Sequence, residues 1–349
     1  LLCGHHCQIE QFWGNSLTDT ACALSIGGHA IRNRAFLAPM AGITDRPFRE
    51  IAERFGAGLV VSEMVASAAL STGHGGMVRK LTRAGTLPHV VQLAGCEAEW
   101  MAEGARIAEG AGADIIDINF GCPAKRVTNG YAGSALMRVP DQALGIVEAV
   151  AGATTRPVTV KMRLGWDDES LNAAQIAQLA VSAGAQMITV HGRTRQQFYK
   201  GQARWGLVRD VVEAVDVPVV VNGDIVDTAS ARQALAESGA AAVMLGRGAQ
   251  GQPWRVGQIG AALAGQEAEA PPEGAELVAL IQQHYEDMLV DYGVEVGLRA
   301  ARKHLGWYAD AAGLALDKPT RTQLLDNEDT KAVLSLIDTL FSGEWRAAA

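Results

Sequence analysis

The stretch DIIDINFGCPAKR occupies residues 114–126. Its apolar first half is typical of a buried strand, which ends at Asn119 and is followed by a glycine and by Cys122 beside a proline. Two cations, Lys125 and Arg126, come next. Polar groups directly after a buried parallel strand lie where such sheets bind ligands. The stretch therefore bears on both fold and site.

Seven further short apolar runs have the same form. The eight runs are 35–38, 59–61, 89–93, 114–119, 158–162, 187–191, 217–222 and 242–246. Successive runs start 24 to 44 residues apart, which leaves room for a helical crossover between parallel strands. The pattern predicts an α/β fold of the (β/α)₈, or TIM-barrel, type. A doubly wound sheet is the alternative, but the loop APMAGITD after the first run has no GxGxxG turn.

The barrel is expected to occupy residues 26–262, after an N-terminal extension, 1–25, that we expect to be disordered. Residues 263–274 begin the stretch LAGQEAEAPPEGAE, whose Ala, Glu, Pro and Gly content is typical of a linker. Amphipathic patterns fill residues 275–349 and predict a small all-helical C-terminal domain.

The composition is that of a globular protein, with 48% hydrophobic residues and a formal charge of −8. No apolar run approaches a membrane span, and the first residues lack the pattern of a secretory signal. Five scattered cysteines fit a reducing compartment, so we expect a cytoplasmic protein. We also expect a monomer without membrane attachment. Cys3, His5, His6 and Cys7 have no second ligand cluster, and we expect no metal.

Polar or small residues end nearly every apolar run. These strand ends contain Pro39, Met40, Ala41, Glu63, Gln92, Asn119, Cys122, Lys161, Arg163, His191, Asn222, Gly223, Asp224, Gly246 and Arg247. Because the C-terminal ends of barrel strands share one face, we expect them to form one ligand site.

The Gly-rich loop 243–254, which contains Arg247, follows the last run and is suited to a phosphate. Lys161 could stabilise negative charge on an electron-accepting ring, and Gln92 and Asn222 offer both donors and acceptors. Flavin mononucleotide (FMN) fits these requirements. The structural alternatives are an ordinary ion pair for Lys161 and a hydrogen-bonded barrel-mouth residue for His191.

Cys122 has four possible roles. As a metal ligand it lacks neighbouring Cys or His residues, and as a nucleophile it has only His191 as a strand-end base. As a general acid it must keep its proton near neutral pH, and Lys125 and Arg126 oppose this if they lie close. We expect the side chains of Lys125 and Arg126 to face an anionic substrate, RNA, instead. The fourth possibility is an inert buried thiol.

Several motifs together resemble those of the flavin-dependent tRNA-dihydrouridine synthases, and most of all their bacterial B-type, or nitrogen-regulation-protein-3-like, branch. The motifs are APMAGITDRPFR (38–49), DINFGCPAKRV (117–127), AGSALM (132–137), VKMRLGW (160–166), HGRTR (191–195), NGDI (222–225), GRGAQGQPW (246–254) and ARKHLGWY (301–308). The resemblance covers residues 26–341. It implies a (β/α)₈ barrel with FMN, a helical tRNA-binding domain, and reduction of a D-loop uridine to dihydrouridine with NADPH.

The resemblance also implies roles for individual residues. Cys122 would donate a proton to C5 of the uracil, opposite hydride transfer from flavin N5 to C6, and Asn119 would touch the target base. Arg193 and Tyr199 would be loop contacts to RNA, and Arg126 stands where the family more often has lysine. The flavin would be lined by Pro39, Met40, Ala41, Gln92, Lys161, His191, Asn222, Gly223, Asp224, Gly246 and Arg247.

Two basic segments predict a local RNA footprint on an acidic chain. Residues 191–209 interleave aromatic residues with five cations and contain no acid; the cations are Arg193, Arg195, Lys200, Arg204 and Arg209. In the tail, Arg299, Arg302 and Lys303 lie on one helical face. A solvated face is the alternative for the tail.

Two rival functions stay open on the residues alone. One is an FMN barrel that acts on a free pyrimidine, as dihydroorotate or dihydropyrimidine dehydrogenases do; it would need neither the basic segment nor the helical tail. The other is a non-catalytic, regulatory RNA-binding barrel, which would have no use for Cys122 or Lys161.

Overall fold

The computed structural model describes residues 24–343. The expected disordered extension lies outside this range except for its last two residues, and the cluster from Cys3 to Cys7 lies wholly outside it. The described chain opens with a small antiparallel hairpin of β1 (Ser25–Ile26) and β2 (His29–Ala30).

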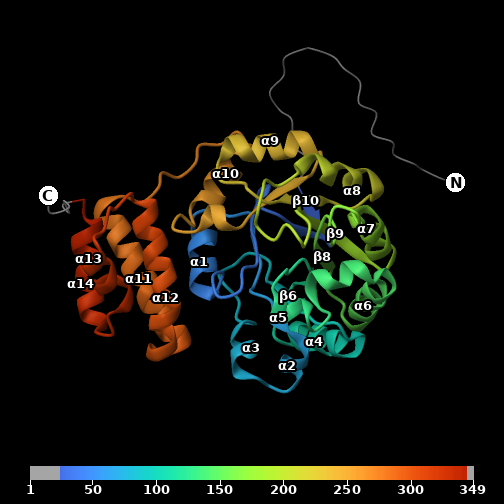
Figure 1. Ribbon diagram of the computed structural model, residues 1–349, viewed down its shortest axis with the longest axis horizontal. Helices are drawn as coiled ribbons and strands as arrows, with labels where there is room; N and C mark the ends of the chain where they lie inside the picture. The colour runs from blue at the N-terminus through green and yellow to red at the C-terminus, as the bar shows by residue number, and fades with distance from the viewer. Residues whose placement is uncertain (1–23, 344–349) are drawn as a thin grey trace, which may run out of the picture.

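One parallel sheet forms the centre of the molecule, in the order β4-β3-β11-β10-β9-β8-β7-β6-β5 (Figure 1). Its strands are β3 (Ala35–Leu37), β4 (Leu59–Val60), β5 (Val65–Ala66), β6 (Val90–Ala94), β7 (Ile115–Phe120), β8 (Val158–Arg163), β9 (Ala185–His191), β10 (Val219–Asn222) and β11 (Ala242–Leu245). A parallel bridge between Val61 and Val90 joins the β4 edge to β6 and closes the ring. The predicted (β/α)₈ barrel is confirmed.

The second apolar run, 59–61, forms the short strand β4, and β5 is a further paired strand that follows beyond the end of this run. Between them, the N–H of Ser62 donates to the carbonyl of Val90 (3.0 Å), and the Ser62 hydroxyl accepts from the N–H of Gln92 (3.0 Å). A side-chain bond thus replaces a main-chain bond, and the strand leaves the regular ladder before Glu63.

Helices cover the outside of the barrel. They are α1 (Arg46–Arg54), α2 (Ser67–Ser71), α3 (Gly75–Arg79), α4 (Ala98–Gly110), α5 (Lys125–Thr128), α6 (Pro140–Ala153), α7 (Ala173–Ser182), α8 (Arg209–Ala214), α9 (Thr228–Ser238) and α10 (Arg255–Leu263), with 3₁₀ turns η1 (Gly133–Arg138), η2 (Trp205–Val208) and η3 (Arg247–Ala249). Local chemistry sets their ends: Asp45 caps α1 by accepting from the N–H of Phe48 (3.1 Å), and Pro47 lies in the first turn. None of the described helices is long and apolar enough to cross a membrane.

The barrel interior changes from apolar to polar along the strands. Towards their N-terminal ends, Phe36, Val90, Ile115 and Met244 pack with Ile26 of the hairpin. Because side chains alternate along a strand, the residues two and four positions further on share the same inward face. These include Gln92, Asp117, Asn119, Lys161, Arg163, His191 and Asn222. The alternation therefore gathers the polar residues at one end of the barrel.

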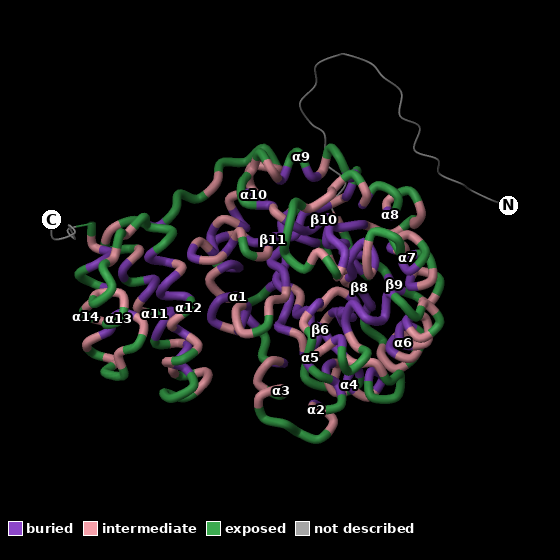
Figure 2. Tube along the Cα trace, viewed as in Figure 1, coloured by how far each residue is buried: buried purple, intermediate pink, exposed green. Residues whose placement is uncertain are grey.

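The C-terminal part is helical, as predicted. Its helices are α11 (Gly274–Tyr292), α12 (Val294–Ala311), α13 (Lys318–Asp326) and α14 (Thr330–Phe341). They share an apolar core, which also takes in Phe55 and Trp254 from the barrel. Buried residues recur along α11 and α12 (Figure 2). Helix α11 contacts α1, and an ion pair between Arg46 and Asp291 (3.0 Å) crosses this interface.

Candidate active site

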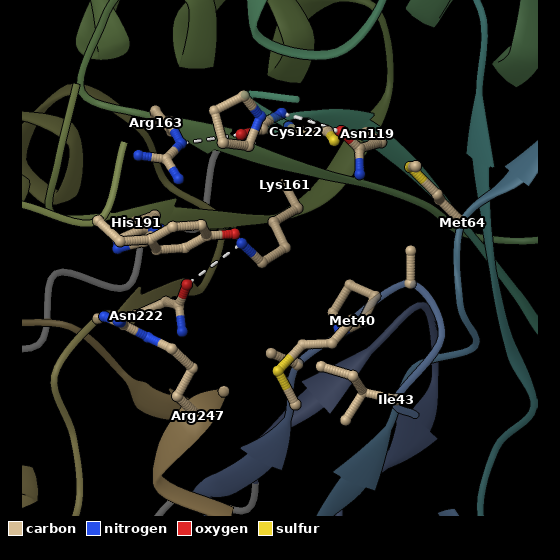
Figure 3. Close-up of a pocket in the computed structure, with 18 of the residues that line it drawn as sticks. Met40, Ile43, Met64, Asn119, Cys122, Lys161, Arg163, His191, Asn222 and Arg247 are labelled. Atoms are coloured by element: carbon tan, nitrogen blue, oxygen red, sulfur yellow. Dashed lines mark hydrogen bonds between the residues drawn. The ribbon is translucent and has the colours of Figure 1, made fainter. Parts of the chain in front are cut away.

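A cavity of about 610 Å³ opens at the C-terminal ends of the barrel strands (Figure 3). Fifteen residues with a predicted role at the flavin, the uracil or the RNA line it. They are Pro39, Met40, Ala41, Gln92, Asn119, Cys122, Arg126, Lys161, His191, Tyr199, Asn222, Gly223, Asp224, Gly246 and Arg247. Lys125, Arg193, Arg195 and the α12 cations do not line it.

A chain of hydrogen bonds crosses the barrel just below the cavity. Asp117 is buried and accepts from the hydroxyl of Thr159 (2.6 Å) and from Nε2 of Gln92 (2.7 Å). Oε1 of Gln92 in turn accepts from Nδ2 of Asn119 (2.7 Å). Burial raises the pKa of Asp117 to about 6, although both donors work against this rise. The chain links strands β6, β7 and β8 through side chains.

The same Asn119 holds the turn that carries Cys122. Its Oδ1 accepts from the N–H groups of Gly121 (3.1 Å) and Cys122 (2.9 Å). The carbonyl of Cys122 accepts from both the N–H (3.1 Å) and the hydroxyl (2.9 Å) of Ser134, and Nε of Arg163 donates to the carbonyl of Gly121 (2.9 Å). The backbone that presents the thiol is therefore fixed on both sides.

In the close-up, Lys161 lies between this turn and Asn222 (Figure 3). Its Nζ donates to Oδ1 of Asn222 (3.2 Å), whose Nδ2 donates to the carbonyl of Met244 (2.7 Å). Burial lowers the pKa of Lys161 to about 8; nearby Arg163 adds to this, and Asp117 opposes it. An ammonium has three donors, so Lys161 keeps donor capacity for a ligand.

His191 is neutral at pH 7, because burial lowers its pKa well below the usual value and the neighbouring cations, Arg163 first among them, lower it further. Its Nε2 faces a guanidinium nitrogen of Arg193 at 3.4 Å. An arginine can only donate, so Nε2 is an acceptor and the proton is on Nδ1.

Arg193 is expected to contact RNA, but in this structure it is 2% exposed. Its guanidinium binds both carboxylate oxygens of Asp224 (2.8 and 2.5 Å) and the carbonyls of Lys200 (3.1 Å) and Gly201 (2.6 Å). Burial acts to raise the pKa of Asp224, but the hydrogen bonds from Arg193 and from the N–H of Ala203, together with the charges of Arg193 and Arg247, lower the pKa overall. Arg193 therefore fastens the loop after β9 to the end of β10, with no surface left for RNA.

The other expected RNA contacts have varied surroundings. The guanidinium of Arg195 lies over the ring of Trp166, 4.7 Å from its centroid, and Lys125 is exposed on α5. On α12, Arg299 pairs with Glu295 (3.2 Å) and Arg302 with Asp326 (3.5 Å). Lys303 donates to the carbonyl of Gly42 in the barrel (2.5 Å).

Several lining residues received no role from the sequence. Ile43, Met64, Phe198, Gln250 and Arg255 were not named as site residues, and Arg163 was named only among the strand ends expected to share the site. Arg163 stands at a strand end, which is a usable signal. Its guanidinium binds the carbonyls of Thr194 and Phe198, both at 2.9 Å, and so also shapes the wall that carries Tyr199.

The cavity wall is cationic. One carboxylate, that of Asp224, faces five cations along the lining, which are Arg126, Lys161, Arg163, Arg247 and Arg255. Low-dielectric walls focus such a field, so the cavity attracts anions although the whole chain has a formal charge of −8.

A TIM barrel with a cationic cavity at its strand ends, a lysine on the floor and a thiol on the wall defines a barrel enzyme. The family model for dihydrouridine synthase (Dus) matches residues 36–342. The chain belongs to the dihydrouridine synthase family, which makes it an enzyme of the flavin-dependent kind.

Relatives cover most of the chain. A probable tRNA-dihydrouridine synthase of Rhodobacter capsulatus is 57% identical over 308 residues, 88% of this chain and 94% of the relative. A tRNA-dihydrouridine synthase B of Xanthomonas axonopodis pv. citri is 42% identical over 323 residues, 92% of this chain and 97% of the relative.

Among solved structures, morphinone reductase aligns with a TM-score of 0.50 at 16% identity, over 73% of this chain and 91% of that one. At this identity, the likeness bears on the fold alone.

Proposed function

We propose that this enzyme reduces a uridine in the D-loop of tRNA to 5,6-dihydrouridine, with FMN in the cavity and NADPH as electron donor. The substrate class, tRNA, is taken from the relatives, which are tRNA-dihydrouridine synthases. The observation that carries the chemistry is the placement of a single thiol, Cys122, on the cavity wall, on a turn fixed by Asn119.

The residues present fit FMN. The cavity volume of about 610 Å³ is in the usual range for such ligands, roughly 300–1,000 Å³. A Cβ at Gly246 would make only ordinary contacts, with Sδ of Met40 at 3.6 Å, so packing does not require a glycine there. The bare main chain instead leaves room for a group in the cavity, beside Arg247.

We assign the contacts as follows. Gly223, Gly246 and Arg247 would hold the phosphate, and Lys161 would face the redox ring. When bound, FMN would supply the hydride. The amide groups of Gln92 and Asn222 are each hydrogen-bonded through both their oxygen and their nitrogen, which fixes their orientation in the cavity.

The role of Cys122 is to hold a proton on Sγ and give it to C5 of the uracil. Asn119 uses its Oδ1 to fix the Cys122 turn and one Nδ2 hydrogen to bind Gln92. One Nδ2 hydrogen is left over for the base. We propose that Asn119 both positions the thiol and contacts the uracil.

The nucleic acid would meet a cationic rim. Arg126 and Tyr199 line the cavity and Lys125 is exposed beside it, so the three can contact nucleotides around an extruded uridine. On the helical part, the side chain of Arg299 is largely exposed, and Arg302 lies about one turn further along α12. Phosphate contacts there would be salt-dependent.

The test is formation of dihydrouridine in unmodified tRNA by the purified chain with FMN and NADPH. Cys122→Ala should bind FMN and tRNA but lose about 10²- to 10⁴-fold in rate, the usual loss for a general acid. Cys96→Ala removes a second partly buried thiol, outside the cavity, and should keep the parent rate.

Equal rates for parent and Cys122→Ala would remove Cys122 as the proton donor. If the parent oxidised NADPH and made no dihydrouridine in tRNA, the free-pyrimidine alternative would be tested with uracil and orotate-type substrates. A chain that takes up no FMN would contradict the proposal.

A further inference from the structure

The turn 40–44 after β3 forms one wall of the cavity. Met40, Ala41 and Ile43 line the cavity from this turn. Inside the turn, the N–H groups of Ile43 and Thr44 both donate to the carbonyl of Met40 (3.0 Å), and the hydroxyl of Thr44 accepts from the N–H of Met40 (2.8 Å). The turn is therefore a compact unit that can shift only as a whole.

Gly42, at the outer tip of this turn, is bonded in two directions. Its N–H donates to Oε1 of Glu63 (2.5 Å), and its carbonyl accepts from Nζ of Lys303 (2.5 Å). Gly42 has a φ of +70°, and a Cβ there would approach Nζ of Lys303 to 3.1 Å. The close fit of the lysine thus depends on the missing side chain.

The barrel-side anchor is itself fixed. Glu63 is buried and pairs with Lys80 (3.6 Å), whose Nζ donates to the carbonyl of Met64 (3.1 Å). Met64 also lines the cavity (Figure 3). On the other side, Lys303 belongs to α12, so this wall of the cavity is held between the barrel and the helical part.

Docking of the helical part does not depend on Lys303. Asp291 pairs with Arg46 (3.0 Å) and with Arg79 (3.6 Å), and the hydroxyl of Tyr292 donates to Oδ2 of Asp45 (3.1 Å). These contacts lie on α1, α3 and α11 rather than on α12. Loss of the Lys303 ammonium therefore removes one of the two anchors of the turn without releasing the helices.

We propose that Lys303 is a positioning residue for the cofactor: from the helical part, it holds the 40–44 turn in the position that the flavin requires. The inference rests on the proposed function. It gives Lys303 a role different from that of Arg299 and Arg302, although the three lie close together on one helix. Its ammonium has two further donors, so a contact to RNA is compatible with this role.

The test is FMN affinity of the full chain, without tRNA, measured by flavin fluorescence after removal of FMN. Lys303→Met should raise the dissociation constant about five- to tenfold, as expected for one exposed hydrogen bond from a charged donor. Lys303→Arg keeps a cationic donor and should recover most of the affinity. Arg299→Met, on the same helix and paired with Glu295, should leave the dissociation constant unchanged.

Two further measurements, the thermal midpoint and the KM for tRNA, separate the possible outcomes. The thermal midpoint of Lys303→Met should stay near that of the parent, because the docking contacts remain. An unchanged FMN affinity in Lys303→Met, with a raised KM for tRNA as in Arg299→Met, would overturn the positioning role and leave Lys303 as an RNA contact. A parent chain that binds no FMN would overturn both proposals together.

Discussion

Asn119→Asp keeps the size of the side chain and removes one donor from the hydrogen-bond chain below the cavity. The chain has a single consistent direction, because the N–H groups of Gly121 and Cys122 can only donate and must face Oδ1. Nδ2 must then face Oε1 of Gln92, and Nε2 of Gln92 must face Asp117. An aspartate at position 119 therefore has no proton to donate to Oε1 of Gln92.

The cost can be worked out from these contacts. The hydrogen bond from residue 119 to Gln92 is lost, about 1 kcal/mol, and Oε1 of the buried Gln92 is left without a donor, about 1–3 kcal/mol. Rotation of the Gln92 amide does not help, since its oxygen would then face the Asp117 carboxylate. We expect Asn119→Asp to lose about 2–4 kcal/mol of unfolding free energy at pH 8.

The assay is urea unfolding of parent and variant from pH 5 to pH 8. A proton taken up by Asp117 or by the new carboxyl restores the missing donor, so the native variant binds one more proton than its unfolded chain. Its stability relative to the parent should therefore fall as pH rises, by at most about 1.4 kcal/mol per pH unit. Asn129→Asp adds the same charge at an exposed position and should show no such slope.

A penalty below about 0.5 kcal/mol, or one that is equal at pH 5 and pH 8, would refute the assigned direction of the chain. Loss of stability with full dihydrouridine synthesis would refute only the link between Asn119 and the position of Cys122.

Two further outcomes follow from shifted pKa values. Burial raises the pKa of Asp45, which accepts from Tyr292, to about 7. The native protein therefore keeps a proton that the unfolded chain releases near pH 4. The free energy of unfolding should fall as pH rises from about 4 to about 7. Asp45→Asn cannot ionise, so its urea-unfolding free energy should lack that part of the slope, and an unchanged slope would contradict the assignment. Because the pKa of Lys161 is lowered to about 8, FMN affinity should fall above pH 8, by up to about tenfold per pH unit, as the ammonium is lost. Fluorescence titration should show no such fall in Lys161→Met; a parallel fall in both proteins would contradict a contact between Lys161 and the flavin.

The sequence predicts the barrel well because one rule, alternation along a parallel strand, fixes both core and site. Asn119 and Lys161 pair directly across β7 and β8. Any residue at a strand end on the inward face must reach the same cavity, so most of its lining follows from the apolar runs. Arg163 obeys the same rule: it was expected among the strand ends that share the site, but no sequence pattern indicated its specific role there.

Sequence patterns fail where a side chain finds a partner far along the chain. Arg193 lies in a segment with five cations and no acid, yet it forms an ion pair with Asp224, 31 residues further along the chain. Lys303 shares a helical face with Arg299, yet its ammonium reaches a carbonyl 261 residues earlier. A local count of charges gives no information on such pairs, because they depend on how the loops and domains meet.

Two walls of the cavity, the Cys122 turn and the 40–44 turn, are thus held by different parts of the molecule. The Cys122 turn is fixed by Asn119, Ser134 and Arg163, all within the barrel. The turn around Gly42 is fixed by the barrel on one side and by α12 on the other. A displacement of the helical part, for example on binding of tRNA, can therefore be transmitted through Lys303 to the proposed cofactor wall. The Cys122 turn, which is held only by barrel residues, would keep its position. Stability and FMN affinity should separate along this division: Asn119 variants should affect mainly stability and the thiol, and Lys303 variants mainly the cofactor.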